Sequence, residues 1–342
     1  MLHLYKKVVP AIMISSVAVY RFVKGMINKT ATFFSVSWWR LTTYATRKKL
    51  GLLRIKIYEN LTFDHLSTSE LMSIAKHEAH RIEKAHYSGY MKTRKCKSYD
   101  ISYGHVCEIL VLLESRGVDM ESADIRWLKK VTDYFHRMDE FLEEGKGELP
   151  RFDPEKFVEF EQKAKQRRST RTWGESSFSK AELEEIGRSL IECARWAPCS
   201  GNRQPWFFKL LIEPEEKILL RGIKEEHCVS APLVIFVGVR KSSYGAIGTN
   251  EQGMYVDGGA VSMQMVMAAH AAGLGSCWNH FCKDFVYSRP KNLPIFKNFY
   301  EKTGIPEDIE PIALIAFGNP AFVSPPPQRP PFEALCPRGE QG

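Results

Sequence analysis

Apolar residues recur at helical spacing in the first half of the chain. A capping box at Ser67-Thr68-Ser69-Glu70 opens a run with apolar residues every third or fourth position, which predicts a helix over about 68–86. Similar runs follow near 106–113, before Gly117, and near 125–142. The region from 60 to 145 is therefore predicted to be mostly α-helical.

The pattern changes near residue 150, where we place a domain boundary. Gly145 to Pro150 reads as a break, and Asp153-Pro154 supplies an N-cap and a first-turn proline for the next helix. Beyond it, Ser179 opens a helix by a second capping box, and strand-like apolar runs alternate with helical ones. We expect an α+β domain with a long helix at about 254–272 and strands at 207–212, 233–239, 275–278 and 312–317.

Charge is distributed unevenly. The net charge is +8, but the first 58 residues hold eleven Lys or Arg and no Asp or Glu. Because the positive excess sits in one terminal arm, a nucleic-acid-binding surface on the folded part is not expected. The arm also carries Phe33, Phe34, Trp38 and Trp39, a mixture suited to the headgroups of an anionic membrane. It either makes such a peripheral contact or packs on the protein.

Neither a spanning helix nor a disulfide framework is predicted. The apolar run from Val8 to Tyr20 is shorter than the roughly 20 residues that cross a bilayer. The eight cysteines show no CxxC pairs, which favours reduced thiols and a cytoplasmic location. With 342 residues, the chain is long enough for two domains.

Three segments of the second half carry candidate chemistry. The first is a basic turn that could hold a phosphate dianion, or could be a solvated face: Arg167, Arg168, Ser169, Thr170 and Arg171. The second, Ala197 to Trp206, is rich in turn formers and amide side chains, which suits either a loop against a planar heterocycle or an ordinary surface connection. The third begins at Asp257-Gly258-Gly259 and continues as a Met-rich helix, which indicates a core or a subunit interface.

Taken in order, these segments resemble the nitroreductase family. That family shows an Arg-Arg-Ser-x-Arg opening, an Ala-Pro-Ser-Ser-x-Asn-x-Gln-Pro-Trp loop, an Asp-x-Gly helix ending in Gly-Leu-Gly-Ser-x-Trp, and a late Gly-Asn-Pro with a downstream Arg. The chain matches over about 170 residues. Its matching segments are Arg167–Arg171, Ala197–Trp206, Asp257–Trp278, Gly318-Asn319-Pro320 and Arg329.

The resemblance implies an FMN site, with residues carried over by position. The basic turn, above all Arg167, Ser169 and Arg171, together with Arg329, would bind the phosphate and the ribityl chain. Asn279, His280 and Phe281 occupy the stretch whose backbone N–H groups approach flavin N5 in relatives, although relatives often have glycine at the last two positions. The loop against the isoalloxazine would comprise Pro198, Cys199, Ser200, Asn202 and Gln204, with Cys199 in place of the more frequent Ser.

The resemblance also implies an activity and an assembly. FMN would lie at a homodimer interface, and NADH or NADPH would deliver hydride to it before a small organic acceptor takes the electrons in a ping-pong reaction. Two alternatives stay open: a flavoenzyme acting on a surface-polysaccharide or peptide intermediate, and a non-catalytic binding protein with this fold. The expected organisation is a nitroreductase-like FMN domain over 151–337, with a central mixed sheet flanked by helices. A basic arm over 1–58 and a helical extension over 60–148 would precede it.

Other site types find little support. No GxGxxG follows a strand, and no GxxxxGK[ST] occurs. His77 and His80 flank Glu78 without the HExxH spacing, and Cys277, His280 and Cys282 overlap the expected flavin segment. We expect no metal site, and we name no catalytic acid or base, because a flavin would carry the difficult step itself.

Overall fold

The computed structural model describes residues 62–87, 97–137, 140, 150–175, 178–244, 252–282 and 292–336. The chain divides into two units, Met1–Thr62 and Phe63–Gly342. The basic arm, its proposed membrane contact and most of the break at 145–150 lie outside the described residues. Among those that are described, none of the helices has both the length and the apolar run required to span a bilayer.

Among its described residues, the second unit begins with three helices, α4 (Thr68–Tyr87), α6 (Lys97–Ser115) and α7 (Ala123–Tyr134). The capping box that opens α4 is confirmed, because the Ser67 backbone N–H donates to Glu70 and the Glu70 N–H donates to the Ser67 hydroxyl. The apolar stripes predicted from the sequence face one another in the core. Their buried members include Leu71, Ile74, Ile82, Val106, Ile109, Leu113, Ile125, Leu128 and Val131.

In the domain that follows, the described residues form one four-stranded sheet. Its strands are β1 (Trp206–Leu211), β2 (Leu233–Arg240), β3 (Gly275–His280) and β4 (Ile309–Gly318), in the order β1-β2-β4-β3 with every pairing antiparallel. The predicted strands and the α+β class are confirmed. The expectation of a mixed sheet is wrong for the described strands, because each of them pairs with its neighbours in antiparallel fashion. β4 starts three residues earlier than predicted: Pro311 interrupts the apolar pattern, yet it fits the strand beside a bulge opposite Gly238.

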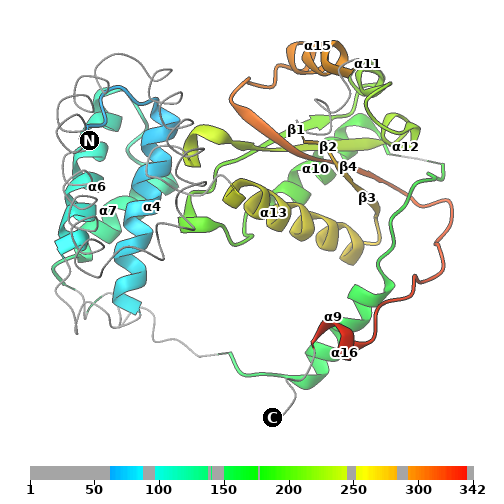
Figure 1. Cartoon of the computed structure of the whole chain (residues 1–342), viewed down its shortest axis with the longest axis horizontal. Coiled ribbons are helices and arrows are strands. Elements are labelled where there is room, and N and C mark those ends of the chain that lie inside the picture. Colours follow the sequence, from blue (N-terminus) through cyan, green and yellow to red (C-terminus); the bar gives the residue numbers. More distant parts are fainter. Residues whose placement is uncertain are drawn as a thin grey trace, which may run out of the picture. The chain divides into compact units, whose positions relative to one another are not determined.

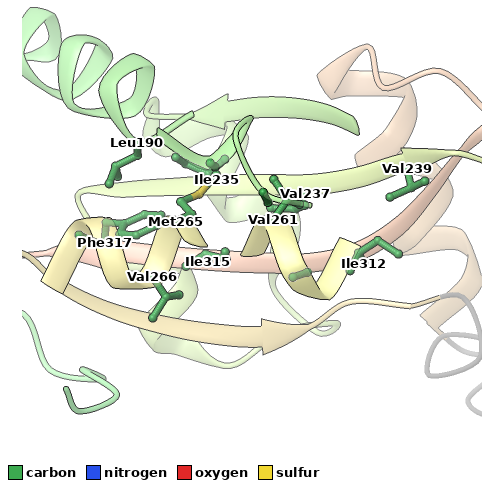
Figure 2. Close-up of a cluster of buried hydrophobic side chains, with 14 of the residues drawn as sticks. Leu190, Ile235, Val237, Val239, Val261, Met265, Val266, Ile312, Ile315 and Phe317 are labelled. Carbon is green, nitrogen blue, oxygen red and sulfur yellow. The ribbon is translucent and has the colours of Figure 1, made fainter. Parts of the chain in front are cut away.

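Helices cover both faces of this sheet (Figure 1). One face packs against α10 (Lys180–Ala194) and α13 (Gln252–Ala271), and Figure 2 shows Val261 and Met265 of α13 directed at β2 and β4. The other face packs against short helices and α15 (Leu293–Thr303). The remaining elements are α9 (Pro154–Gln166), η1 (Ser200–Asn202), α11 (Pro214–Lys217), η2 (Ile218–Leu220), α12 (Glu226–Val229), η3 (Lys241–Tyr244) and α16 (Phe332–Leu335).

The small residues of α13 let this helix approach the sheet closely. A Cβ added at Gly258 would lie 2.6 Å from Cγ1 of Ile312 in β4. The opposite side of α13 exposes Tyr255, Val256 and Met263. The helix therefore packs on the core through one side only, and its other side is an apolar surface of the single chain.

Buried histidines distinguish the first three helices from an ordinary apolar bundle. Burial lowers the pKa of His77 to about 3, and lowers the pKa of His86 and of His105 to about 4. Each imidazole is therefore neutral in the folded chain over a pH range in which an unfolded histidine becomes protonated.

This difference makes stability depend on pH. Because the folded pKa values lie below the unfolded value of 6.5, the unfolded chain binds more protons as pH falls through 6.5, and stability is lost towards acid. Between pH 6.5 and 5.0 we expect each histidine to remove up to about 1.5 kcal/mol from the free energy of unfolding. Urea titrations at the two pH values would measure this loss. His86→Gln should make the free energy of unfolding depend less on pH, and His65→Gln, at an exposed position, is the control. Equal stability at the two pH values would contradict it.

Candidate functional site

The basic turn lies along the free edge of β3, at the strand's first residues. It follows the end of α9, and the Thr170 backbone N–H donates to the Ser276 carbonyl at 2.8 Å, beside a bridge between Ser169 and Ser276. Thr170 is buried under this contact, whereas Arg171 is exposed. The sheet edge thus fixes the backbone of the turn and leaves Arg171 directed outward.

Two of the arginines interact electrostatically with the same residue of β3, Cys277. Burial raises the pKa of the Cys277 thiol, and the positive charges of Arg171 and Arg167 oppose that rise, so both guanidiniums lie near its sulfur. Arg168 behaves differently, because its Nη1 donates to the carbonyls of Lys165 and Arg167 at the end of α9. It therefore closes the helix as well as adding charge.

A third cation at this corner, Lys224, was missed by the sequence reasoning. Its amine donates to the His280 carbonyl and lies near Cys228 and Cys277, while burial lowers its pKa. Two glutamates follow it directly in the sequence, which makes it look like part of a solvated charged loop. Only the fold brings it beside β3.

The same corner contains a small group of potential metal ligands. Ligand atoms of Glu225, His227 and Cys228 lie within 4.8 Å of one another. His227 is already engaged, since its Nε2 lies 2.9 Å from Oδ1 of Asn279. Three cations, Arg167, Arg171 and Lys224, and one carboxylate, Glu225, act on the cysteines of this corner, so positive charge outweighs negative charge there.

The three residues at the end of β3 present different groups. Asn279 donates from Nδ2 to the carbonyls of Cys277 and Leu314, so its amide supports the strand. His280 is exposed. Phe281 is fully buried among aromatic rings, and its backbone N–H donates to the Ile312 carbonyl at the bulge of β4. The expected approach of this stretch to flavin N5 stays a prediction, and His280 is its most accessible member.

The loop before β1 has an unusual backbone. Gly201, Asn202 and Gln204 all have positive φ, at 62°, 49° and 49°. Such angles cost about 1 kcal/mol or more each outside glycine and persist only where surrounding contacts impose them. Within the loop, the Gln204 N–H points to the Cys199 sulfur at 3.3 Å, and Gln204 Nε2 donates to Oδ1 of Asn202 at 3.0 Å. Pro198 and Ser200 are exposed beside them.

Buried polar side chains hold the loop from beneath. Asp257, at the start of the predicted Asp-Gly-Gly motif, accepts the Ser200 backbone N–H at 2.8 Å and the Tyr244 hydroxyl. Arg203 is only 3% exposed and donates to the Ser200 carbonyl at 2.6 Å, with its guanidinium over the Tyr244 ring. Burial and the Asp257 carboxylate together raise the pKa of Tyr244, which keeps the phenol protonated as a donor. Arg203 and Tyr244 were not predicted as site residues.

The loop and the basic turn do not meet in one chain. The loop leads into β1, at one edge of the described sheet, whereas the basic turn lies along β3 and residues 279–281 form its end, at the other edge. Three strand spacings separate these edges by about 14 Å, and β2 and β4 lie between them. Arg329 lies exposed in the extended tail after β4.

Beside the basic turn lies an open pocket of about 570 Å³, whose lining includes Arg171, Trp173 and Lys217. The Lys217 amine is engaged by the carbonyls of Ala231 and Pro232, at 2.7 and 3.2 Å. Lys217 therefore fixes the turn into β2, and Arg171 is the exposed cation of this pocket.

Comparison with known proteins agrees with the order of the motifs. The model of the nitroreductase family matches residues 164–227 and 219–319, a stretch that includes the basic turn, the loop and β1 to β4. Residues 164–319 form a nitroreductase-family domain. The resemblance inferred from the motifs is thus confirmed for this part of the chain, and the three helices over 68–134 precede the matched region.

Individual relatives match about half of the chain. An NADH dehydrogenase/NAD(P)H nitroreductase of Archaeoglobus fulgidus is 28% identical over 162 residues, which are 45% of this chain and 81% of that protein. The structure of an FMN-dependent nitroreductase from Clostridium difficile is 22% identical, with a TM-score of 0.40, and the match covers 48% of this chain and 90% of that chain. The structure of a nitroreductase family protein from Streptococcus pneumoniae is 21% identical, with a TM-score of 0.41, and the match covers 52% of this chain and 99% of that chain.

The hydroxyl of Tyr244 tests the support beneath the loop. Tyr244→Phe removes the donor to a buried carboxylate oxygen of Asp257, so we expect the free energy of unfolding to fall by about 1 to 3 kcal/mol. Tyr255→Phe is the matched control, because the Tyr255 hydroxyl lies 3.4 Å from Glu310 and its side chain is partly exposed. Urea unfolding measures both, and equal effects would show that Asp257 does not depend on Tyr244.

Proposed function

We propose that this protein is an FMN-dependent oxidoreductase that takes electrons from NADH or NADPH and passes them to a small organic acceptor. The observation that carries the proposal is the cationic corner beside β3, formed by Arg167, Arg171 and Lys224 in a nitroreductase-family domain. The NAD(P)H in the name of the Archaeoglobus relative supports the choice of donor.

The residues present fit FMN at both of its ends. Guanidinium groups bind phosphate by charge-assisted, bidentate hydrogen bonds, and exposed Arg171 is free of the helix-capping role that engages Arg168. Arg329 adds a further cation from the tail. At the ring end, the amide groups of Asn202 and Gln204 and the exposed backbone around Ser200 can hydrogen-bond the edge of an isoalloxazine.

FMN, when bound, supplies hydride and electron transfer, so the chain's task is binding and orientation. In our proposal Arg167, Ser169, Arg171 and Arg329 hold the phosphate end, and the loop fixes the plane of the ring. His280, exposed at the end of β3, borders the space that donor and acceptor would occupy in turn, in a ping-pong order.

We further propose that the site is completed by a second copy of the chain. The loop and the basic turn lie at opposite edges of the sheet, which favours a flavin that takes the loop from one chain and the basic turn from the other. Apolar surface is available for such an interface: Val256 of α13 is 71% exposed, and α9 buries none of its residues although it carries Phe157, Val158 and Phe160.

The colour of the purified protein tests the cofactor and the activity. We expect a yellow protein whose visible flavin absorbance is bleached by NADH or NADPH under nitrogen and returns with quinones or nitroaromatics. A colourless protein that FMN cannot reconstitute would contradict the proposal and favour a binding role for this domain.

Substitutions of the cations test the phosphate site. Arg171→Ala and Arg329→Ala should each cost about 1.5 to 3 kcal/mol of FMN affinity, or roughly 10- to 150-fold in Kd, the value of a hydrogen bond to a charged group. Quenching of FMN fluorescence measures the Kd. Arg195→Ala is the matched control, since Arg195 pairs with Glu192 on the surface of α10. Unchanged binding in Arg171→Ala would remove the basic turn from the site.

A charge on the exposed side of α13 tests the dimer. Val256→Glu would bury a carboxylate in the proposed interface, so we expect a monomer that has lost FMN together with its partner. Light scattering after gel filtration measures the mass. Val111→Glu on α6 serves as the control, because Val111 is exposed to a similar degree. A Val256→Glu dimer that retains FMN would exclude this side of α13 from the interface.

A further inference from the structure

We propose that helix α4, which lies outside the family domain, is part of the flavin site, where His77 and Lys76 position the loop from Cys199 to Gln204. The inference rests on the proposed function for the identity of the ligand, but not for the contact itself. α4 contacts both η1, within the loop, and η3, which carries Tyr244.

His77 packs directly on the backbone of Gly201. A Cβ added at Gly201 would lie 2.0 Å from Nδ1 of His77 and 2.7 Å from Nη1 of Arg203, so no larger residue fits while the imidazole is in place. Gly201 also has a φ of 62°, which glycine adopts without strain. The His77 ring therefore contacts the loop at Gly201, the first of its residues with positive φ.

Lys76 fixes the orientation of an amide in the loop. Its amine lies 2.6 Å from a carboxylate oxygen of Asp124 in α7 and donates to Oε1 of Gln204 at 3.4 Å. An ammonium group can only donate, so Gln204 presents its oxygen to Lys76 and its nitrogen to Oδ1 of Asn202. A chain of contacts thus runs from α7 through α4 to the two amides proposed to face the isoalloxazine.

Charge also ties α4 to the loop. Glu78 is 0% exposed, pairs with Arg81 at 3.1 Å, and lies close enough to the Arg203 guanidinium to interact with it electrostatically. Arg203 therefore lies near two carboxylates from different parts of the chain, Glu78 in α4 and Asp257 in α13. Burial raises the pKa of Glu78, and the positive charges of Arg81 and Arg203 oppose that rise, so α4 and the loop interact through charge as well as through packing.

These contacts explain how the loop keeps its strained backbone. Asn202 and Gln204 hold φ values that ordinary residues avoid, and the domain itself supplies only part of the restraint, through Asp257. Arg203 adds a hydrogen bond to the Ser200 carbonyl, and α4 adds the contacts of His77 and Lys76. The helical extension is then a component of the site that orients the flavin-facing amides, and His77 and Lys76 are positioning residues.

Substitution of Lys76 in the full-length protein tests this role. Lys76→Met keeps the length and the packing of the side chain but loses the donor to Gln204, so we expect about a 10-fold weaker FMN Kd, the effect of one hydrogen bond. The visible spectrum of bound FMN should shift, because the loop amides change orientation. Lys76→Arg should restore both. Lys129→Met is the matched control, since Lys129 bonds to Met120 and lies 3.8 Å from Glu121 on the far side of α7 from this contact.

A second pair of variants tests the contact of His77 with Gly201. Gly201→Ala alone should weaken FMN binding by displacing the loop, and adding His77→Ala should recover part of the loss, because space for the new methyl group is opened. Hydrogen exchange in the flavin-free protein adds a readout that needs no cofactor: His77→Ala and Lys76→Met should speed exchange in peptides spanning 199–206.

The outcomes separate the inference from the proposed function. A wild-type protein that never binds FMN would end the proposed function, while the exchange experiment would still decide the contact. FMN binding that is the same in Lys76→Met as in wild type, or exchange over 199–206 that neither variant alters, would overturn the inference. The inference would also be overturned if the double variant lost as much FMN affinity as Gly201→Ala and His77→Ala together, because the two residues would then act independently.

Discussion

The structure depends on one constraint, the order of strands in a single antiparallel sheet. The order β1-β2-β4-β3 puts the strained loop at one edge and the cationic turn at the other, with β2 and β4 between them. Neither group alone is a complete ligand site: the turn offers charge for an anion, and the loop offers amides for a flat polar ring. We therefore propose that a ligand with both features is held between two chains, with the apolar side of α13 as surface for their contact.

The loop illustrates how a site can be rigid without regular structure. Three of its residues have positive φ, a conformation that is unfavourable outside glycine and needs surrounding contacts to hold it. Restraint comes from Asp257 below, from Arg203 buried against Tyr244, and from α4. These groups come from segments far apart in the chain. The conformation of the loop therefore depends on the folding of both the domain and the helices before it.

Much of the fold and part of the site could be predicted from the sequence. Capping residues and apolar periodicity located α4, α10, α13 and all four strands, because those signals are local. The start of β4 was missed, since Pro311 breaks the pattern and is accommodated only by a bulge formed with β2. Within the site, the motifs located the turn and the loop. Lys224 and the contact of His77 with Gly201 could not be predicted, because each joins residues more than fifty positions apart.

The most direct test of the account is complementation between two defective chains. One chain carries Arg171→Ala, which removes the cationic turn, and the other carries Asn202→Ala together with Gln204→Ala, which removes the loop amides. Each variant alone should bind FMN so much more weakly than wild type that little is bound at a concentration that saturates the wild-type protein. In a heterodimer purified through two different tags, one site combines both defects and the other has none, so we expect one FMN for each pair of chains. A heterodimer that binds no FMN would show that each flavin contacts a single chain, and would contradict the account.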